Sequence, residues 1–279
     1  MNEMDIIIIT KNSAEPCLNQ CLSSIADAAD FKDLQPRLIV IDGESTDGTL
    51  DIVNSYQKQL DPLIILDQGN RATARQKGLE HVETDLFAFI DSDVVLTRNW
   101  FKDMMPYFEN HEVGAVWGAA LHMDPKRKKY FEAMAKLYGA KPITMMRRYG
   151  EKRGCLHDTM IRKTAIEEIK IPPELHVMED HYIRLYIEER GWKWVSTERP
   201  HVRHFMGEDH PRNAYMDAYY GWKLGVYDRS WYIKHMAFSW AKLAYLLLET
   251  RDLEIVKVEM IKEWQFLKAT MTLLKEALY

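Results

Sequence analysis

Four uninterrupted apolar runs lie in the first third of the chain, and polar residues follow each of them. Isoleucine, valine and leucine dominate these runs, which is typical of strands buried on both faces of a sheet. Between the runs, apolar residues recur at helical spacing, for example Leu18, Cys21, Leu22 and Ile25. This alternation with short connections predicts an α/β fold with a doubly wound, mostly parallel sheet. The predicted strands are residues 4–10, 37–41, 63–66 and 87–90.

In the middle third of the chain strands and helices still alternate, but the periodicity is less regular. Pro172 and Pro173 break the chain ahead of a helix that we expect to begin near Glu179 and to end before Gly191. The basic segment 140–152 has no clear period and is predicted to be a loop. Further helices are expected at 99–108, 124–138 and 164–169, and further strands at 113–121, 154–161 and 193–196.

The final part of the chain has helical periodicity throughout and is rich in Tyr, Trp, Met and Leu. We expect helices at about 212–227, 231–250 and 253–278. The change of pattern predicts two domains, a sheet domain at 1–210 and a helical appendage at 211–279. The appendage would pack on the sheet domain, form a homodimer or rest on a membrane surface, and the pattern leaves these alternatives open.

The composition is that of a folded, mildly acidic protein, with a formal net charge of −5 and 47% hydrophobic residues among 279. Nucleic-acid binding is not expected, because it usually needs a concentrated basic field. Cys17, Cys21 and Cys155 are expected to be reduced core thiols, although the first two would share a helix face where zinc could bind. No signal peptide is evident, and the apolar stretch 236–248 is interrupted by Lys242. We therefore expect a cytoplasmic protein that is soluble or peripheral on the membrane.

Carboxylates stand at the ends of two predicted strands. Asp91 and Asp93 follow the strand 87–90, and Asp42 follows the strand 37–41. In an open α/β sheet ligands bind at the carboxyl ends of strands, and two carboxylates there can hold a hard divalent cation that binds a diphosphate. Each of these carboxylates can also cap a following helix or close a turn, so both interpretations stay open at this stage.

Two further charged pairs stand at predicted helix starts. Arg71 and Arg75 are four residues apart and would share a helix face, where a basic pair can neutralise a diphosphate. Glu179 and Asp180 open the helix that ends before Gly191, a position that the helix dipole favours for acidic residues. Solvated surface arginines and plain helix capping are the alternatives for the two pairs.

These residues belong to five landmarks that follow one another along the chain. The landmarks are TKN at 10–12, DGESTDGT at 42–49, GNRATARQKGL at 69–79, FIDSDV at 89–94 and MEDHYIRLYIEERGWKW at 178–194. With them in this order, the chain resembles glycosyltransferase family 2, whose members have the GT-A fold. The resemblance implies a GT-A catalytic domain at 1–210, with a nucleotide-sugar-binding half at 1–95 and an acceptor-side half at 96–210.

The resemblance implies a site for a UDP- or GDP-sugar at the first strand ends. Asp91 and Asp93 match the Asp-x-Asp motif, whose second carboxylate is usually a direct ligand of Mn²⁺ or Mg²⁺ and whose first lies closer to the ribose. Arg75 matches the basic residue near the diphosphate, and Arg71 is predicted beside it because it shares the helix face. The residues that the resemblance assigns to the base and ribose are Thr10, Asn12, Asp42 and Asp47.

The resemblance also implies the catalytic base. Asp180 matches the acidic residue that takes the proton of the acceptor hydroxyl in inverting members, while a divalent ion and an arginine stabilise the leaving diphosphate. His204, or alternatively His201, would complete the metal site, because a histidine after the last core strand does so in some GT-A enzymes. A nitrogen ligand suits Mn²⁺ better than Mg²⁺, and a hydrogen-bonded structural role is the alternative for both histidines.

The sequence constrains the acceptor least. Trp117, Arg153, His157 and the segment 140–152 would lie on the acceptor side, where basic residues suit an anionic acceptor such as a lipid-linked phosphate or a glycan. No Gln-x-x-Arg-Trp sequence follows Asp180, which favours a single sugar addition over polymerisation.

Two other classes of function stay open. A sugar-phosphate nucleotidyltransferase would carry a Gly-rich, Arg-containing loop after the first strand, whereas this chain has Lys11, Asn12 and Ser13 there. A non-catalytic nucleotide-sugar- or partner-binding protein with the GT-A fold is the other alternative. Its weakness is that the predicted base, metal motif and arginine are all present.

Overall fold

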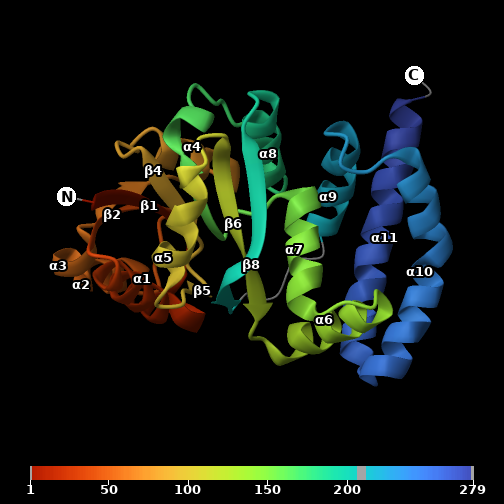
Figure 1. Ribbon diagram of the computed structural model, residues 1–279. Helices are drawn as coiled ribbons and strands as arrows, with labels where there is room; N and C mark the ends of the chain where they lie inside the picture. The colour runs from red at the N-terminus through yellow and green to blue at the C-terminus, as the bar shows by residue number, and fades with distance from the viewer. Residues whose placement is uncertain (1, 206–211, 278–279) are drawn as a thin grey trace. The chain divides into compact units, whose positions relative to one another are not determined.

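The computed structural model describes residues 2–205 and 212–277 of the chain (Figure 1). Two compact units form within it, which we name the sheet unit and the helical unit. The sheet unit comprises Met1–Met123 and Ile143–Met206, and the helical unit comprises Asp124–Pro142 and Gly207–Tyr279. The predicted domain boundary at residue 210 stays a prediction, since this grouping also places 124–142 with the tail.

One mixed sheet forms the centre of the sheet unit, in the strand order β3-β2-β1-β4-β7-β6-β8-β5. The first four strands in that order are parallel, as predicted, whereas β7 is antiparallel to both of its neighbours. The prediction of an α/β fold is therefore confirmed. The strands are β1 Asn2–Thr10, β2 Leu34–Asp42, β3 Leu63–Leu66, β4 Leu86–Ile90, β5 Val94–Val95, β6 Val113–His122, β7 Asp158–Arg162 and β8 Lys193–His204.

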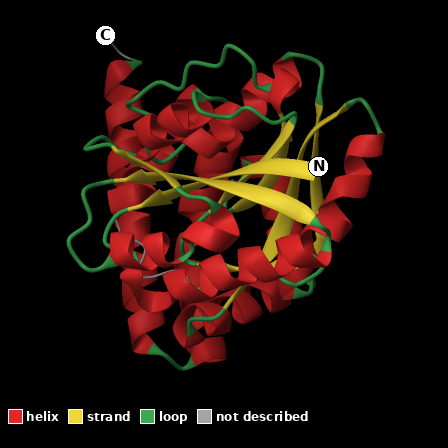
Figure 2. Cartoon of the chain, turned by 90° about the vertical axis from the view of Figure 1, so that its left-hand side faces the viewer, coloured by secondary structure: helices red, strands yellow, loops and turns green. Residues whose placement is uncertain are grey.

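Helices cover both faces of this sheet (Figure 2), so the central strands are buried on both sides. Along β1, Ile6 and Ile8 pack into the core on one face and Ile7 into the core on the other. This alternation explains the uninterrupted apolar runs of the sequence. The helices of the sheet unit are η1 Ala14–Leu18, α1 Asn19–Phe31, α2 Thr49–Ser55, α3 Gln57–Leu60, α4 Arg71–Leu79, α5 Trp100–Met104, η2 Met105–Glu109, α7 Pro142–Arg153, η3 Lys163–Ala165 and α8 Glu179–Glu189.

The prediction of a loop at 140–152 is wrong, because this part of the chain forms helix α7. Its buried positions are Met146, Gly150 and Arg153, a short stripe at helical spacing that charged residues obscure in the sequence. Gly150 lies directly on Trp117, where an added Cβ would come within 2.0 Å of the indole ring. Close packing against β6 therefore stabilises this helix. Such a contact between distant segments is not visible in local helix propensity, so the sequence did not predict the helix.

Two other boundaries differ from the prediction. In place of the predicted helix 164–169 stands only the short 3-10 helix η3, so that prediction is wrong. Strand β8 continues far beyond the predicted end at 196 and reaches His204, because it pairs along most of its length with β6 and finally with β5. This extension places His204 inside the sheet rather than after it.

The helical unit consists of long helices, as predicted, and Asp124, Asp228 and Asp252 cap three of them through side-chain hydrogen bonds. Its core is aromatic, with Tyr232 and Phe266 at the centre. None of the described helices is both long enough and apolar enough to cross a membrane. The helices are α6 Pro125–Leu137, α9 Arg212–Lys223, α10 Arg229–Thr250 and α11 Leu253–Glu276.

Candidate active site

A polar network joins the carboxyl ends of β1 and β2. The buried carboxylate of Asp42 accepts hydrogen bonds from the hydroxyl of Thr10 at 2.7 Å, and from the backbone N–H and hydroxyl of Ser45 at 2.7 and 2.6 Å. Both oxygens of Asp42 are thus engaged inside the protein. Asp42 closes the turn after β2, which is the structural role that its position in the sequence also allowed.

Asn12 and Asp47, two further predicted site residues, link the loops that follow β1 and β2. Asn12 accepts a hydrogen bond from the backbone N–H of Thr46 at 2.8 Å, and Asp47 accepts one from the backbone N–H of Ala14 at 3.0 Å. Asp47 also accepts a bond from the hydroxyl of Thr49 at 2.6 Å, which is the main cause of its lowered pKa. The structure therefore brings Thr10, Asn12, Asp42 and Asp47 together at one edge of the sheet.

Arg75 links two of the predicted motifs. Its buried guanidinium donates to Asp91 at 3.0 Å and to Glu179 at 3.3 Å, and it lies 5.0 Å from the ring centre of Phe89. Burial alone would lower the pKa of Arg75, but the charges of Asp91 and Glu179 outweigh it and raise the pKa. Arg71, one turn earlier on α4, is exposed, so the two predicted arginines have different environments.

The acidic side of this network contains one group that sequence reasoning did not assign. Burial and the nearby charge of Asp180 raise the pKa of Glu179, and its Oε2 atom has no hydrogen-bond partner among the described residues. The pKa of Asp91, by contrast, is lowered, because the charge of Arg75 outweighs the effect of burial. The signal for Glu179 was its place beside Asp180 in the last landmark, where capping was one interpretation.

Asp93 and His204 lie together, as expected for two ligands of one cation. Antiparallel pairing of β5 with β8 brings His204 Nε2 to 3.2 Å from Asp93 Oδ1. One carboxylate oxygen and one imidazole nitrogen suit Mn²⁺. Within residues 2–205 and 212–277, no three His, Cys, Asp or Glu side chains are close enough to complete a cation site. His201 lies opposite Ala119, and because it is three residues before His204 in a strand it faces the other side.

A buried histidine and carboxylate lie behind His204. The ring centres of His157 and His204 are 5.0 Å apart, and His157 Nδ1 is 2.6 Å from Asp158 Oδ1. Burial lowers the pKa of His157, but the charge of Asp158 outweighs this effect and raises it. Trp100 donates to the second oxygen of Asp158 at 3.2 Å. His157 was predicted on the acceptor side, and the structure places it next to the Asp93 and His204 pair.

The predicted base Asp180 is held by an arginine. Arg153, the last residue of α7, donates to Asp180 Oδ1 and, at 2.7 Å, to the backbone carbonyl of Val177. The backbone carbonyl of Arg153 lies 2.7 Å from Nδ1 of His181, whose pKa is lowered to about 4 by burial. The helix that sequence reasoning missed thus supplies the side chain that positions Asp180.

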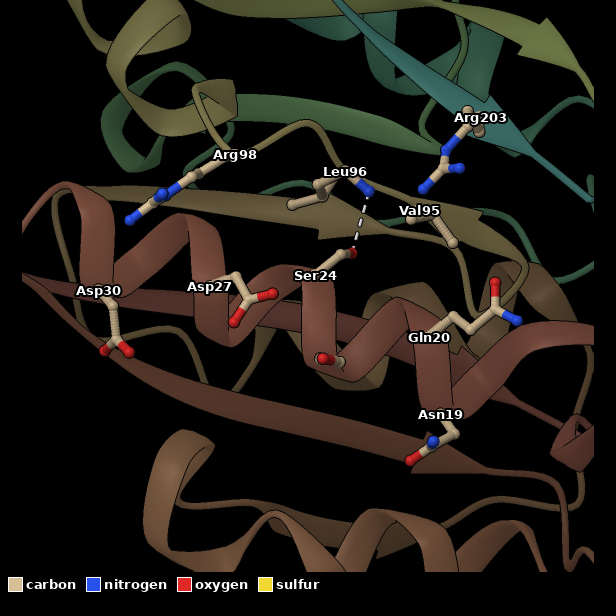
Figure 3. Close-up of a pocket in the computed structure, with 10 residues that line it drawn as sticks. Asn19, Gln20, Ser24, Asp27, Asp30, Val95, Leu96, Arg98 and Arg203 are labelled. Atoms are coloured by element: carbon tan, nitrogen blue, oxygen red, sulfur yellow. Dashed lines mark hydrogen bonds between the residues drawn. The ribbon is translucent and has the colours of Figure 1, made fainter.

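A separate pocket of about 640 Å³ lies between α1 and β5 (Figure 3). Asp27 and Asp30 line it on the α1 side, and Arg98 and Arg203 line it from other segments. Arg203 and His204 are consecutive in β8 and so point to opposite faces of the sheet. The pocket therefore contains none of the predicted site residues, and the network around Arg75 is the better candidate for the chemistry.

Comparison with known proteins agrees with the landmarks. The chain matches the family described as Glycosyl transferase family 2 over residues 5–170, which is more than half of its length. The poly(ribitol-phosphate) β-N-acetylglucosaminyltransferase TarS of Staphylococcus aureus is 29% identical over 114 residues, which cover 40% of this chain and 20% of that protein. The putative glycosyltransferase EpsH of Bacillus subtilis is 24% identical over 71% of this chain and 60% of that protein. The chain thus spans only a fifth of the length of the Staphylococcus relative.

Solved structures show the same fold at lower sequence identity. The crystal structure of S. aureus TarS 1–349 gives a TM-score of 0.59 at 15% identity, over 96% of this chain and 89% of that one. A mannosyltransferase of Pyrobaculum calidifontis, PcManGT, gives 0.57 at 15% identity, over 98% and 74%. The resemblance seen in the sequence and the prediction of the GT-A fold are both confirmed. The chain belongs to glycosyltransferase family 2.

Proposed function

We propose that this chain is an inverting, divalent-metal-dependent glycosyltransferase that transfers a sugar from a UDP- or GDP-sugar to a hydroxyl or phosphate acceptor. The observation that carries the proposal is the buried Arg75, which joins Asp91 of the Asp-x-Asp motif to Glu179. Through this arginine the metal motif and the residue before the proposed base Asp180 form one network. The Arg75 and Glu179 side chains of this network are buried, and buried charges are costly to keep, which is typical of functional sites.

The proposed donor site begins at the ends of β1 and β2. Thr10, Asn12, Asp42 and Asp47 would surround the base and ribose, since the hydrogen bonds that these side chains make tie together the two loops that the nucleotide would contact. Arg71 is exposed in the first turn of α4, where its guanidinium could pair with a diphosphate. Structural relatives solved in complex with UDP-GlcNAc and with GDP-Man and Mn²⁺ support a nucleotide-sugar donor.

The proposed cation would be Mn²⁺ or Mg²⁺, held by Asp93 and by Nε2 of His204, with Asp91 beside them. The residues fit this role, because they offer an oxygen and a nitrogen ligand 3.2 Å apart. The remaining positions suit diphosphate oxygens and water, as is usual for cations that bind nucleotides. A bound divalent cation would neutralise the diphosphate and improve it as a leaving group.

The proposed reaction is a single displacement. The acceptor oxygen forms a bond to the anomeric carbon while the bond from that carbon to the diphosphate breaks, and its electron pair leaves with the nucleoside diphosphate. The acceptor proton passes to the carboxylate of Asp180. Arg153 engages Oδ1 of Asp180, which orients the group and leaves the other oxygen to take the proton. Attack from the face opposite the leaving group inverts the anomeric carbon.

The proposed acceptor is an anionic glycan or a lipid-linked hydroxyl or phosphate. The Staphylococcus relative acts on poly(ribitol-phosphate), an anionic polymer, which supports this class. Of the basic residues predicted to meet the acceptor, Arg147 is engaged with Glu198 at 3.3 Å, while Arg148 and Lys152 are exposed on α7. The free, buried cysteines fit the cytoplasm as the location, with the helical unit available for contact with a membrane or with a second copy.

The test is release of nucleoside diphosphate from UDP-GlcNAc and from GDP-Man in the presence of Mn²⁺. We expect one donor to be consumed by the unaltered protein, and Asp93→Ala to weaken the metal-dependent binding of its nucleotide. Donor binding without any release would instead identify a non-catalytic binding protein. Release of pyrophosphate from a nucleoside triphosphate and a sugar phosphate would identify a nucleotidyltransferase.

A further inference from the structure

One face of α11 is apolar and uncovered. Its row consists of Met260, Trp264, Leu267, Met271 and Leu274, which follow one another at alternating intervals of four and three residues. Such spacing keeps the side chains on one side of the helix. All five are exposed, and Trp264 is 56% exposed. The opposite side of the same helix carries the buried residues of the aromatic core, so the elements of the helical unit do not cover this row.

The charged residues that accompany the row are lysines. Lys257, Lys268 and Lys275 lie three or four residues from its members and are exposed. Lys268 also lies 5.6 Å from the ring centre of Trp264, so its charge is held beside the row. The row and these three lysines are named here the lysine face.

Most acidic residues of α11 are engaged elsewhere. Glu259 and Glu263 pair with Lys242 of α10 on the buried side, and Glu276 pairs with Lys223 of α9 at 2.9 Å. Glu254, in the first turn, is the acidic residue nearest to the start of the face. The lysine face therefore combines apolar bulk with net positive charge.

The neighbouring helix repeats the apolar part of this pattern. Figure 1 shows α10 and α11 side by side, joined by a short connection that reverses the chain direction. On α10 the side chains of Ile233, Met236, Trp240, Leu247 and Leu248 are exposed at helical spacing, and Trp240 is 73% exposed. Two long helices thus each leave an apolar row open, and contiguous exposed apolar rows of this kind mark interaction sites.

The charge of the lysine face decides between two occupants. A second copy of this chain that met the face through a twofold axis perpendicular to α11 would bring lysines against lysines. Helices that pair through such rows usually carry complementary charges beside them. A membrane that contains anionic lipid instead offers negative headgroups for the lysines and an interfacial region that favours tryptophan.

We propose that α10 and α11 bind the surface of an anionic membrane, with the apolar rows inserted at the headgroup boundary and the lysines at the lipid phosphates. Helices that lie in the membrane plane have this combination of apolar and basic positions. The proposal concerns a surface rather than the reaction, so it stands apart from the proposed sugar transfer.

The experiment is flotation of the full chain with vesicles of phosphatidylcholine alone or mixed with phosphatidylglycerol. We expect binding to the mixed vesicles only, weakened by added salt because headgroup attraction is screened. Each of Lys257→Gln, Lys268→Gln and Lys275→Gln should weaken binding about fivefold, which corresponds to about 1 kcal/mol per basic residue near the surface. Trp264→Gln should weaken vesicle binding more than any single lysine variant does, because the inserted ring is lost.

Matched controls come from lysines exposed on the sheet unit. Lys58→Gln and Lys170→Gln remove the same charge elsewhere and should leave vesicle binding unchanged. Equal binding to neutral vesicles, or no binding to either kind, would overturn the proposal. If sedimentation shows that the unaltered protein is a dimer and that Trp264→Gln is a monomer, the lysine face would instead bind a second copy of the chain. No sugar donor enters the assay, so its outcome is independent of catalysis.

Discussion

The two units depart from ordinary protein architecture in opposite ways. The sheet unit buries charges, since Arg75, Asp91 and Glu179 form a network in which the arginine side chain is only 5% exposed. The helical unit exposes apolar bulk, since Trp240 and Trp264 stand open on α10 and α11. Soluble proteins usually place these two kinds of side chain the other way round.

The difference shows what each unit requires from outside the chain. A buried charge is costly unless a partner of opposite charge compensates it, so the sheet unit supplies its own partners and keeps a prepared site. An exposed apolar row can lower the free energy only when something covers it. The sheet unit therefore compensates the buried charge of Arg75 with its own carboxylates, whereas the helical unit leaves its apolar rows uncovered.

The largest expected effect lies at Asp180, at the edge of the buried network. Asp180→Asn keeps the shape and the contact with Arg153 but cannot take the acceptor proton. Turnover should fall by a factor on the order of 10²–10⁴, the usual contribution of a general base. Steady-state kinetics with the active donor measure this loss, and titration with its nucleoside diphosphate should show unchanged binding. Full turnover of the variant would remove Asp180 from the reaction.

The next effect tests whether the buried charges depend on one another. Arg75→Met keeps the bulk but leaves Asp91 and Glu179 without their cation, which should cost about 3–5 kcal/mol in free energy of unfolding. Urea unfolding measures this loss. The matched control is Arg71→Met on the exposed side of the same helix, which should change stability by less than about 0.5 kcal/mol. Equal effects of the two variants would mean that the pairing of Arg75 is not structurally important.

Much of the sheet unit could be predicted because burial on both faces leaves a strong local signal. Apolar runs such as 37–41 locate the strands, and the carboxylates after them locate the edge that holds the site. Family landmarks placed Arg75, Asp91 and Asp180 near one another, and the structure brings these three into one region through Glu179 and Arg153.

The rest depended on contacts between distant segments, which local patterns do not contain. Helix α7 has many charged residues, and its packing on Trp117 became visible only with β6 beside it. The pairing of His204 with Asp93 required the full length of β8, whose predicted end fell eight residues short. Exposure of the rows on α10 and α11 was likewise hidden, since a helical stripe of tryptophan and leucine is more often core.

A pH experiment sharpens the account of the buried site at His181. Burial lowers the pKa of His181 from 6.5 to about 4, so the folded protein keeps this side chain neutral. Between these values the unfolded chain binds the proton and the folded chain does not, so stability is lost as the pH falls from 6.5 toward 4. Fully developed, the loss amounts to about 3 kcal/mol.

His181→Asn isolates this effect, because its amide can still donate to the backbone carbonyl of Arg153 but does not titrate. Urea unfolding of both proteins at several pH values gives the difference in stability between them. The advantage of the unaltered protein should shrink as the pH falls below 6.5. A difference that is constant with pH would show that His181 takes up its proton equally in both states.

The smallest expected effect concerns the exposed apolar row on α11. Trp264→Gln removes a large aromatic ring, yet the free energy of unfolding should change by less than about 0.5 kcal/mol, because the ring is 56% exposed and buries little area within the chain. Phe266→Ala, two residues away on the same helix, should cost roughly 3–5 kcal/mol, since that ring lies in the core against Tyr227 and Tyr232. Urea unfolding measures both.

If Trp264→Gln were as costly as Phe266→Ala, the row would belong to the folding core and would not be free for a membrane. If Trp264→Gln leaves the free energy of unfolding unchanged but loses vesicle binding, the two roles of α11 are separate, with one face for folding and one for binding.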